Sequence, residues 1–360
     1  MEIQWPDHGG QPTEMKRKFH IEKDVIDFSA NIHPFGPPSW LKEALKNSYD
    51  QISHYPDPSY AKANRSLAAF DQVHDEEVLV TNGGAEAIFL TAKLFEGKHA
   101  LIIQPTFSEY ERACKHYHLE VEDVFLHMND ECRLPLEQII EQLDWADVVF
   151  LCRPNNPTGT VAQESDIRRI LEKAKKTGTF LVVDEAFVDF LGDGANLVHL
   201  LKDYENLILL RSLTKMYAIP GVRVGYLLAN REIIKLLKQW QIPWSVNAFA
   251  EAIIPAIVNN QSFVSVSQQF FREELARIRE QLVKLNFYMS PSAVNFYLLR
   301  DNEKPDSTGE LFHFLFHHGV LPRHTDNFKQ LNGNYLRFAV RSQQDNDLLL
   351  KALADWRDRG

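Results

Sequence analysis

The sequence predicts an α/β fold: a large domain built on a mostly parallel sheet flanked by helices, followed by a small α+β domain. Two observations support this. Short apolar runs alternate with helical patterns from about residue 77 to residue 226, and the pattern then becomes mainly helical. Repeated strand–helix units of this length are typical of a parallel sheet covered on both faces. A chain of 360 residues is long enough for one large and one small domain.

The first 40 residues are rich in turn formers and lack sustained periodicity, so we expect an extended arm over residues 1–40. We place the large domain at 41–245 and the small C-terminal domain at 246–360. The strands expected in the large domain are 77–81, 100–103, 148–152, 180–183, 207–210 and 221–228. Its expected helices are 38–47, 85–95, 107–117, 164–175 and 231–239. In the small domain we expect helices at 248–259, 263–285, 308–317 and 346–356, and strands at 294–299, 319–321 and 335–340.

The composition limits the partners of this chain. With a net charge of −10, the chain is not expected to bind nucleic acid or an anionic membrane, and an anionic substrate would need local arginines. Three cysteines without paired spacing suggest no disulfide framework, and neither they nor the 14 histidines show the spacing of metal ligands. No signal-peptide pattern or membrane-spanning run is found, so we expect a cytoplasmic protein.

The turn after the apolar run Leu207–Leu210 carries one lysine, Lys215. Most lysines are solvated surface groups. A lysine at the exit of a buried strand, however, is a nucleophile for aldehydes once it is partly desolvated. Ser212, Thr214 and Arg223 lie nearby in the sequence and are groups that suit a phosphate. A lysine beside a phosphate site is what pyridoxal phosphate requires.

Ser212-x-x-Lys215 followed by Gly-x-Arg223-x-Gly resembles the lysine segment of the fold-type I pyridoxal-phosphate enzymes, the aspartate aminotransferase superfamily. The longer string from Ser212 to Tyr226, together with Gln-Ile-Pro-Trp-Ser-Val-Asn-Ala at 241–248, resembles one branch. That branch is the L-threonine-O-3-phosphate decarboxylases of cobalamin biosynthesis, close relatives of the histidinol-phosphate aminotransferases. The resemblance covers nearly the whole chain. It implies an aspartate-aminotransferase-like fold, pyridoxal 5′-phosphate as cofactor and a homodimer with shared active sites.

A glycine pair joins the expected strand 77–81 to the expected helix 85–95. Ordinary tight turns also use such pairs, but a helix N-terminus offers free N–H groups to an anion. The resemblance assigns the backbone of Gly84 and Ala85 to the cofactor phosphate, with Ser212 and Arg223 completing the site.

Asp184 follows the apolar run that begins at Phe180 and so lies at the carboxyl end of the expected strand. Ligands of parallel sheets bind at this end of the strands. An acidic helix N-cap is the alternative explanation. The resemblance assigns Asp184 to the pyridine nitrogen, which a facing carboxylate keeps protonated. It likewise assigns Asn156 to the O3′ atom and the substrate carboxylate, although the composition of residues 155–159 alone indicates only a turn.

Two aromatic residues match the cofactor site of the superfamily, and one position differs from it. The resemblance implies that Phe107 stacks on the cofactor ring, with a plain core phenylalanine as the alternative. It also implies that Tyr55 reaches the cofactor phosphate of the neighbouring subunit. Phe187 stands where many aminotransferases of the superfamily carry a tyrosine, so Asn156 would be the main O3′ donor.

Two arginines, Arg337 and Arg341, lie four residues apart in the last expected strand and therefore on one face. The resemblance assigns Arg337 to the substrate α-carboxylate, which a planar guanidinium pairs with twice. Our candidates for a substrate phosphate are His8, Asn31 and Arg323. A surface histidine on a loose arm is the alternative for His8, but the decarboxylase branch shares His-Gly-Gly at this place.

The expected function is pyridoxal-phosphate-dependent decarboxylation of L-threonine O-3-phosphate to (R)-1-amino-2-propanol O-2-phosphate, with Lys215 and Asp184 as catalytic residues. Histidinol-phosphate or related aminotransferase activity stays open, because the two reactions differ only in which substrate bond stands perpendicular to the cofactor ring. A third alternative is a non-catalytic effector-binding domain. Such regulators usually append a DNA-binding domain, for which this acidic chain has no room.

Overall fold

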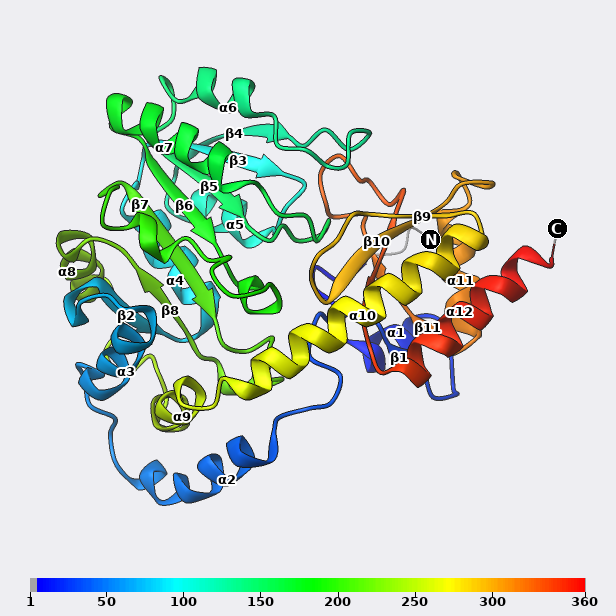
Figure 1. Cartoon of the computed structure of the whole chain (residues 1–360), viewed down its shortest axis with the longest axis horizontal. Coiled ribbons are helices and arrows are strands. Elements are labelled where there is room, and N and C mark those ends of the chain that lie inside the picture. Colours follow the sequence, from blue (N-terminus) through cyan, green and yellow to red (C-terminus); the bar gives the residue numbers. More distant parts are fainter. Residues whose placement is uncertain (1–4, 360) are drawn as a thin grey trace.

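The computed structural model describes residues 5–359, so the first four residues of the expected arm and the last residue of the chain lie outside the described range. Figure 1 shows two lobes, a larger one around a seven-stranded sheet and a smaller one around a four-stranded sheet. Within residues 5–359, no helix has both the length and the apolar character needed to cross a membrane.

The seven-stranded sheet has the strand order β2-β8-β7-β6-β5-β3-β4. Every neighbouring pair is parallel except the two pairs made by β8, so the expected mostly parallel sheet is confirmed. Its strands are β2 (Val78–Thr81), β3 (His99–Gln104), β4 (Glu120–Phe125), β5 (Val148–Cys152), β6 (Phe180–Asp184), β7 (Leu207–Ser212) and β8 (Gly225–Leu228). All residues of β5 and β7 are buried, because helices cover both faces.

Four of the helices around this sheet were expected, namely α4 (Gly83–Lys93), α5 (Glu109–His116), α7 (Glu164–Thr177) and α8 (Arg231–Trp240). Two further helices, α3 (Ala61–Asp71) and α6 (Leu136–Gln142), were not expected from the sequence. Alternate residues of β3 belong to two separate apolar clusters, Leu101 and Ile103 to one and Ala100 and Ile102 to the other. The core of this lobe is therefore divided by the sheet into two layers.

The smaller lobe is built on an antiparallel sheet in the order β12-β13-β10-β9. Its strands are β9 (Phe287–Met289), β10 (Phe296–Asp301), β12 (Arg323–His324) and β13 (Leu336–Ala339), and its helices include α11 (Thr308–His317) and α12 (Gln343–Arg357). The long helix α10 (Ser262–Lys284) runs into it from the larger lobe (Figure 1). Helix α9 (Ala248–Val258) packs on α2 (Ser39–Asn47) and α3 of the larger lobe.

The arm is not extended throughout, which corrects the prediction for residues 1–40. Residues Pro12–Lys18 form helix α1, which has proline in its first turn and basic residues in its last. With seven residues and only Met15 buried, this helix is too short to show apolar periodicity in the sequence. A two-residue strand, β1 (Ile26–Asp27), then pairs in parallel with β11 (Val320–Leu321), so the arm lies in the smaller lobe (Figure 1).

Several predicted strand boundaries differ from the structure, and two of these differences affect arginines of the predicted site. The strand expected at 221–228 begins only at Gly225, because Pro220–Val222 form a short 3₁₀ turn and Arg223 adopts a left-handed backbone with φ +60°. Strand β13 ends at Ala339, so Arg341 does not share its face with Arg337. Arg341 instead pairs with Asp345 at the start of α12.

Candidate functional site

The carboxyl ends of three neighbouring parallel strands bring the predicted residues together. Asp184 is the last residue of β6, and it lies opposite Cys152 of β5 and Leu210 of β7. Asn156 follows β5 by four residues, and Lys215 follows β7 by three. Because parallel strands end at the same edge of a sheet, residues distant in the sequence converge here.

Lys215 is half-buried, and no hydrogen bond or ion pair within residues 5–359 engages its amine. Burial lowers the pKa of Lys215 to about 8, helped by Arg223 and Arg337 and opposed by Asp184. The backbone of Lys215 is held by the N–H of His33, which donates to its carbonyl at 3.1 Å. The backbone of the lysine is therefore fixed in place, and its amine becomes neutral at a lower pH than that of an ordinary lysine.

Asp184 is held by two hydrogen-bond donors inside the protein. The hydroxyl of Tyr110 donates to Oδ2 at 2.7 Å, and the N–H of Ala186 donates to Oδ1 at 2.9 Å. Burial raises the pKa of Asp184, and these donors and Lys215 oppose that rise. A buried carboxylate of this kind is stabilised by any cation that faces it.

The N-terminus of α4 is open. The side chain of its N-cap residue, Asn82, makes no capping hydrogen bond, although the N–H of Asn82 donates to Glu86 at 2.6 Å. A Cβ on Gly84 would meet empty space, so a ligand has room to reach the N–H groups of the first turn. Arg223 lies against this turn, since a Cβ on Gly83 would stand 2.7 Å from its guanidinium. Gly225 pairs with both Thr81 and Ser212, which brings the hydroxyl of Ser212 to the same place.

The structure thus gathers Gly84, Ala85, Ser212 and Arg223 as predicted. Close packing depends on Gly225, where a Cβ would approach the carbonyl oxygen of Arg211 to 2.7 Å and the carbonyl carbon of Gly83 to 2.9 Å. No L-residue with a side chain fits there without moving the backbone.

Two buried arginines lie side by side in the smaller lobe. Arg323 of β12 and Arg337 of β13 are register partners across antiparallel strands, and they are only 2% and 5% exposed. Within residues 5–359, neither pairs with a carboxylate, and both Nε atoms are buried without a partner. Burial lowers the pKa of Arg337 to about 9, with Arg323 adding to the shift, and burial lowers that of Arg323 to about 10.

Neutral groups make the contacts of these two guanidinium groups. Arg337 donates to the side-chain oxygen of Asn156 and to the carbonyl of Ser29, the latter at 2.8 Å. Arg323 donates at 2.7 Å to the carbonyl of Asp7 and to the side chain of Asn327. Both arginines keep their charge at neutral pH, and two adjacent buried charges are costly without counter-ions. The pair is therefore suited to a ligand with two anionic groups.

The arm reaches this pair. A Cβ on Gly9 would stand 2.1 Å from the carbonyl oxygen of Ser29, so only glycine allows the arm to lie so close, and Gly10 donates to the hydroxyl of Ser29 at 2.8 Å. His8 and Arg323 line one small cavity, and Nε2 of His8 lies 3.0 Å from Oε1 of Glu109. His8 is therefore not loose on the surface.

The remaining predicted residues differ in their surroundings. Asn31 is buried, and its side-chain oxygen has no partner. Phe107 is half-buried, with its ring 5.7 Å from that of His8 and 5.9 Å from that of Tyr110. Tyr55 is 83% exposed and lies against Trp244, and none of the described contacts joins it to the other predicted residues.

Residues 23–353 match the family model described as aminotransferase class I and II. The chain belongs to this family. Pyridoxal 5′-phosphate is the cofactor of the class I and II aminotransferases.

Individual relatives span almost the full chain. The threonine-phosphate decarboxylase of Salmonella typhimurium is 36% identical over 350 residues, which cover 96% of this chain and 95% of the relative. The crystal structure of the histidinol-phosphate aminotransferase from Clostridium acetobutylicum superimposes with a TM-score of 0.88 at 30% identity, covering 93% of this chain and 100% of that one. The aspartate aminotransferase of Thermus thermophilus, at 20% identity, matches with a TM-score of 0.84 over 97% and 94% of the two chains, which shows the aspartate-aminotransferase-like fold.

The residues present fit the family's cofactor. The unengaged amine of Lys215, the uncapped start of α4 and the buried carboxylate of Asp184 are the three groups that an aldehyde, a phosphate and a pyridine nitrogen would need. Within the described part of the chain, no group of three or more histidine, cysteine, aspartate or glutamate side chains is placed to hold a metal ion.

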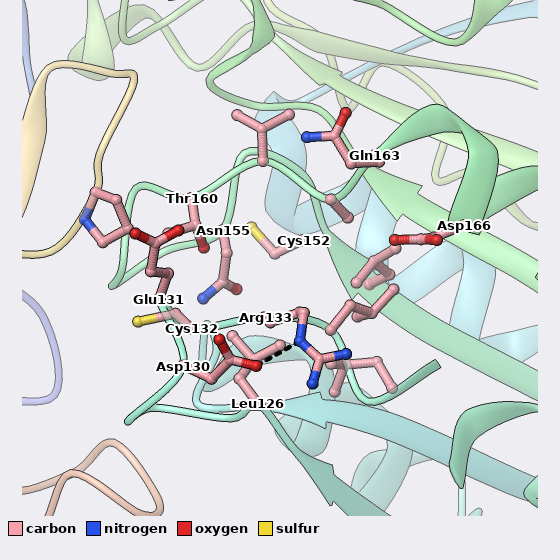
Figure 2. Close-up of a pocket in the computed structure, with 16 residues that line it drawn as sticks. Leu126, Asp130, Glu131, Cys132, Arg133, Cys152, Asn155, Thr160, Gln163 and Asp166 are labelled. Atoms are coloured by element: carbon pink, nitrogen blue, oxygen red, sulfur yellow. Dashed lines mark hydrogen bonds and ion pairs between the residues drawn. The ribbon is translucent and has the colours of Figure 1, made fainter. Parts of the chain in front are cut away.

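A separate cavity of about 350 Å³ lies beside β5 and contains neither Lys215 nor Asp184 (Figure 2). Its lining includes Cys152, Asn155 and the ion pair between Asp130 and Arg133, whose atoms are 2.6 Å apart. Burial raises the pKa of Cys152 to about 12, so its thiol stays protonated. This cavity is therefore lined by other residues than the predicted catalytic pair, Lys215 and Asp184.

Sequence reasoning missed Tyr110 and Glu109, which contact predicted site residues directly. Both lie at the start of an amphipathic helix. An aromatic residue there is usually part of the core, and an acidic residue there usually stabilises the helix dipole. The sequence carries no signal that would have separated them from such ordinary positions.

Proposed function

We propose that this chain is a pyridoxal-phosphate-dependent decarboxylase that converts L-threonine O-3-phosphate to (R)-1-amino-2-propanol O-2-phosphate in cobalamin biosynthesis. The pair of buried, adjacent arginines without carboxylate partners carries the proposal. Threonine phosphate holds a carboxylate and a phosphate in one small molecule and so supplies both counter-ions. In the aminotransferase alternative, histidinol phosphate has the phosphate but no carboxylate, and the amino donor glutamate has two carboxylates but no phosphate. The 36% identity to a threonine-phosphate decarboxylase supports the same choice.

The cofactor, when bound, supplies an electron-withdrawing ring next to the carbon that bears the substrate amine. Lys215 offers a neutral amine for its attachment, because burial lowers the lysine pKa to about 8. We assign to the ammonium form of Lys215 Nζ the delivery of a proton to the substrate Cα, where the new C–H bond replaces the bond to the departed CO₂. Asp184 holds a proton on the ring nitrogen, since its buried carboxylate is stabilised by a facing cation.

The same residues account for binding of the cofactor itself. We assign the backbone of Gly84 and Ala85, with Ser212 and Arg223, to its phosphate, because these groups surround the uncapped start of α4. We place Phe107 over the ring, since it is only half-buried and lies beside Tyr110, the partner of Asp184.

Two anchors orient the substrate in this proposal. Arg337, together with Asn156, binds the carboxylate, and Arg323 binds the phosphate with His8 and Asn31. Anchoring both ends fixes rotation about the bonds of the amine-bearing carbon, and that rotation decides which bond breaks. The packed arm covers the anchors and excludes water from them.

We further propose a homodimer in which Tyr55 of one subunit contacts the cofactor phosphate of the other. Tyr55 and Trp244 are large aromatic side chains that this single chain leaves exposed. Exposed aromatic residues beside each other are typical of protein interfaces.

The test is incubation of the holoenzyme with L-threonine O-3-phosphate, measuring CO₂, the amino-alcohol phosphate and any keto acid. We expect CO₂ and amine without keto acid. Aminotransferase activity is the alternative that the histidinol-phosphate aminotransferase match favours. Pyridoxamine phosphate and a keto acid, formed from glutamate or histidinol phosphate in the absence of CO₂, would establish that alternative instead.

A further inference from the structure

The contact between His8 and Glu109 joins the arm to the larger lobe. Glu109 is the first residue of α5, and its side chain is 11% exposed. Nε2 of His8 lies 3.0 Å from its Oε1. The other ion-pair contact of Glu109 is the outward-facing Arg112 at 3.5 Å. Glu109 is thus a nearly buried carboxylate whose closest charged contact comes from the arm.

The arm does not need Glu109 to stay in place. Trp5 stacks on His324 with ring centroids 3.7 Å apart, and the carbonyl of Asp7 accepts hydrogen bonds from Arg323 and Asn327. Gly10 is bound to Ser29 on the other side of His8. The backbone is therefore held by contacts on both sides of His8 in the sequence. The contact with Glu109 holds the imidazole ring.

The chemistry of imidazole gives this contact a consequence. A neutral ring has one N–H donor, so a carboxylate at Nε2 takes that donor and leaves Nδ1 as an acceptor, which repels an anion. A doubly protonated ring donates from both nitrogens, and carboxylate and phosphate on opposite sides both favour it. With Glu109 at Nε2, the orientation of the His8 ring is fixed, and Nδ1 is the ring nitrogen left for a substrate phosphate.

We propose that Glu109 is a positioning residue that makes the site selective for phosphorylated substrates by fixing the orientation of the His8 ring. The inference rests on the proposed function for the identity of the substrate. Glu109 itself does not touch substrate or cofactor in this proposal. A simple tether between the lobes is the competing explanation, and it would affect every substrate alike.

The matched control is Glu111, two residues along the same helix. It also joins the lobes through an ion pair, with Lys329 at 2.9 Å, but it does not contact His8. Glu109→Gln and Glu111→Gln each remove one charge from α5 at a cross-lobe contact. Comparing them separates an effect on His8 from an effect on lobe attachment.

The experiment uses holoenzyme and two probes, L-threonine O-3-phosphate and L-threonine, with affinities read from the change in the visible spectrum. For Glu109→Gln we expect Kd and KM for L-threonine O-3-phosphate to rise about tenfold, the size of one charged hydrogen bond, with kcat within about twofold. The Kd of L-threonine should stay unchanged. Glu111→Gln should leave both affinities as in the wild type.

If Glu109→Gln weakened the binding of both probes equally, Glu109 would be a tether and the proposal would be wrong. If it weakened the binding of neither probe, the proposal would also be wrong. His8→Asn tests the same contact from the other side. It should weaken only the phosphorylated probe, and the double variant should lose no more than His8→Asn alone, whereas additive losses would contradict coupling. Wild-type enzyme that prefers the phosphorylated probe but releases no CO₂ would refute the decarboxylase proposal while leaving this one standing.

Discussion

The amine of Lys215 lies near the guanidinium groups of Arg223 and Arg337, with the carboxylate of Asp184 opposing them. Burial is the largest cause of its lowered pKa, and the two arginines add to it because a positive amine beside them is unfavourable. The group is protonated below about pH 8 and neutral above it.

We therefore predict the pH dependence of cofactor capture by the apoprotein. The rate should rise with pH through about 8 and level off above it, because only the neutral amine attacks an aldehyde. An ordinary lysine would continue to gain reactivity up to about pH 10.4. The measurement is stopped-flow appearance of visible absorbance after mixing with pyridoxal 5′-phosphate. A midpoint near 10 would contradict the assignment.

Arg337→Ala should separate substrate binding from cofactor binding. Removing one two-pronged charged contact should raise KM for L-threonine O-3-phosphate by about tenfold or more. The holoenzyme should keep its visible band, because Arg337 is not among the groups at the start of α4 that we assign to the cofactor phosphate. Bleached protein would show that Arg337 serves the cofactor or the fold.

At this scale the sequence indicated most of the residues that the structure gathers. Lys215, Asp184 and Arg337 stand out because each is a charged residue beside an apolar strand. The partners Tyr110 and Glu109 do not, since their importance comes from helix α5 meeting β6 and the arm, contacts that are 74 and 101 residues apart in sequence. Pattern reasoning does not detect such pairings.

Strand β8 illustrates how an element controls the site. Its first residue, Gly225, lies between β7 and the turn that opens α4, with no room for a Cβ. The turn residues Gly83 and Gly84 can approach Ser212 only because Gly225 has no side chain.

Gly225→Ala should therefore weaken both the fold and the cofactor site. We expect a loss of about 1–3 kcal/mol in the free energy of unfolding, typical of overpacking, and a higher Kd for pyridoxal 5′-phosphate. The matched control is Gly221→Ala in the preceding turn, where a Cβ would meet open space, and it should change neither quantity. The measurements are denaturant unfolding and cofactor titration. Unaltered cofactor affinity in Gly225→Ala would contradict this account of the turn.

Elements with a strong apolar pattern were predictable, and the others were not. The buried strands β5, β6 and β7 follow continuous apolar runs. Edge strand β4 contains Glu120, Glu122 and Asp123 and is largely solvent-accessible, so it gave no such signal. The two-residue strands β1 and β12 are too short for any periodicity and are defined only by their pairing, whereas β11 falls within the strand expected at 319–321.

For the whole molecule, the two lobes and the fold class were predictable because strand–helix alternation reports a parallel sheet directly. The position of the arm was not, since it depends on pairing with a strand almost 300 residues away. The proposed dimer is likewise a property of the assembled molecule, and it can be tested without a structure of the complex.

Mixing two inactive variants tests the shared site. Lys215→Ala should show no visible band of lysine-bound cofactor and no turnover, and Tyr55→Ala should bind cofactor weakly, because each homodimer has the same defect twice. In a mixed dimer, one site has both defects and the other has neither. We expect mixing with subunit exchange to restore about half of the wild-type activity per mixed dimer. Recovery of no activity, with exchange confirmed by mass spectrometry, would contradict a shared site.

The pairing of β1 with β11 also orders events during synthesis on the ribosome. Most of the larger lobe, with Lys215 and Asp184, emerges long before Val320–Leu321 has been translated, and until then Ile26–Asp27 has no strand to join. Vectorial folding of domains as they emerge is the general rule. The nascent polypeptide would thus acquire its proposed aldehyde-binding half first, and it would become able to recognise a doubly anionic metabolite only when the segment from Val320 onward is released.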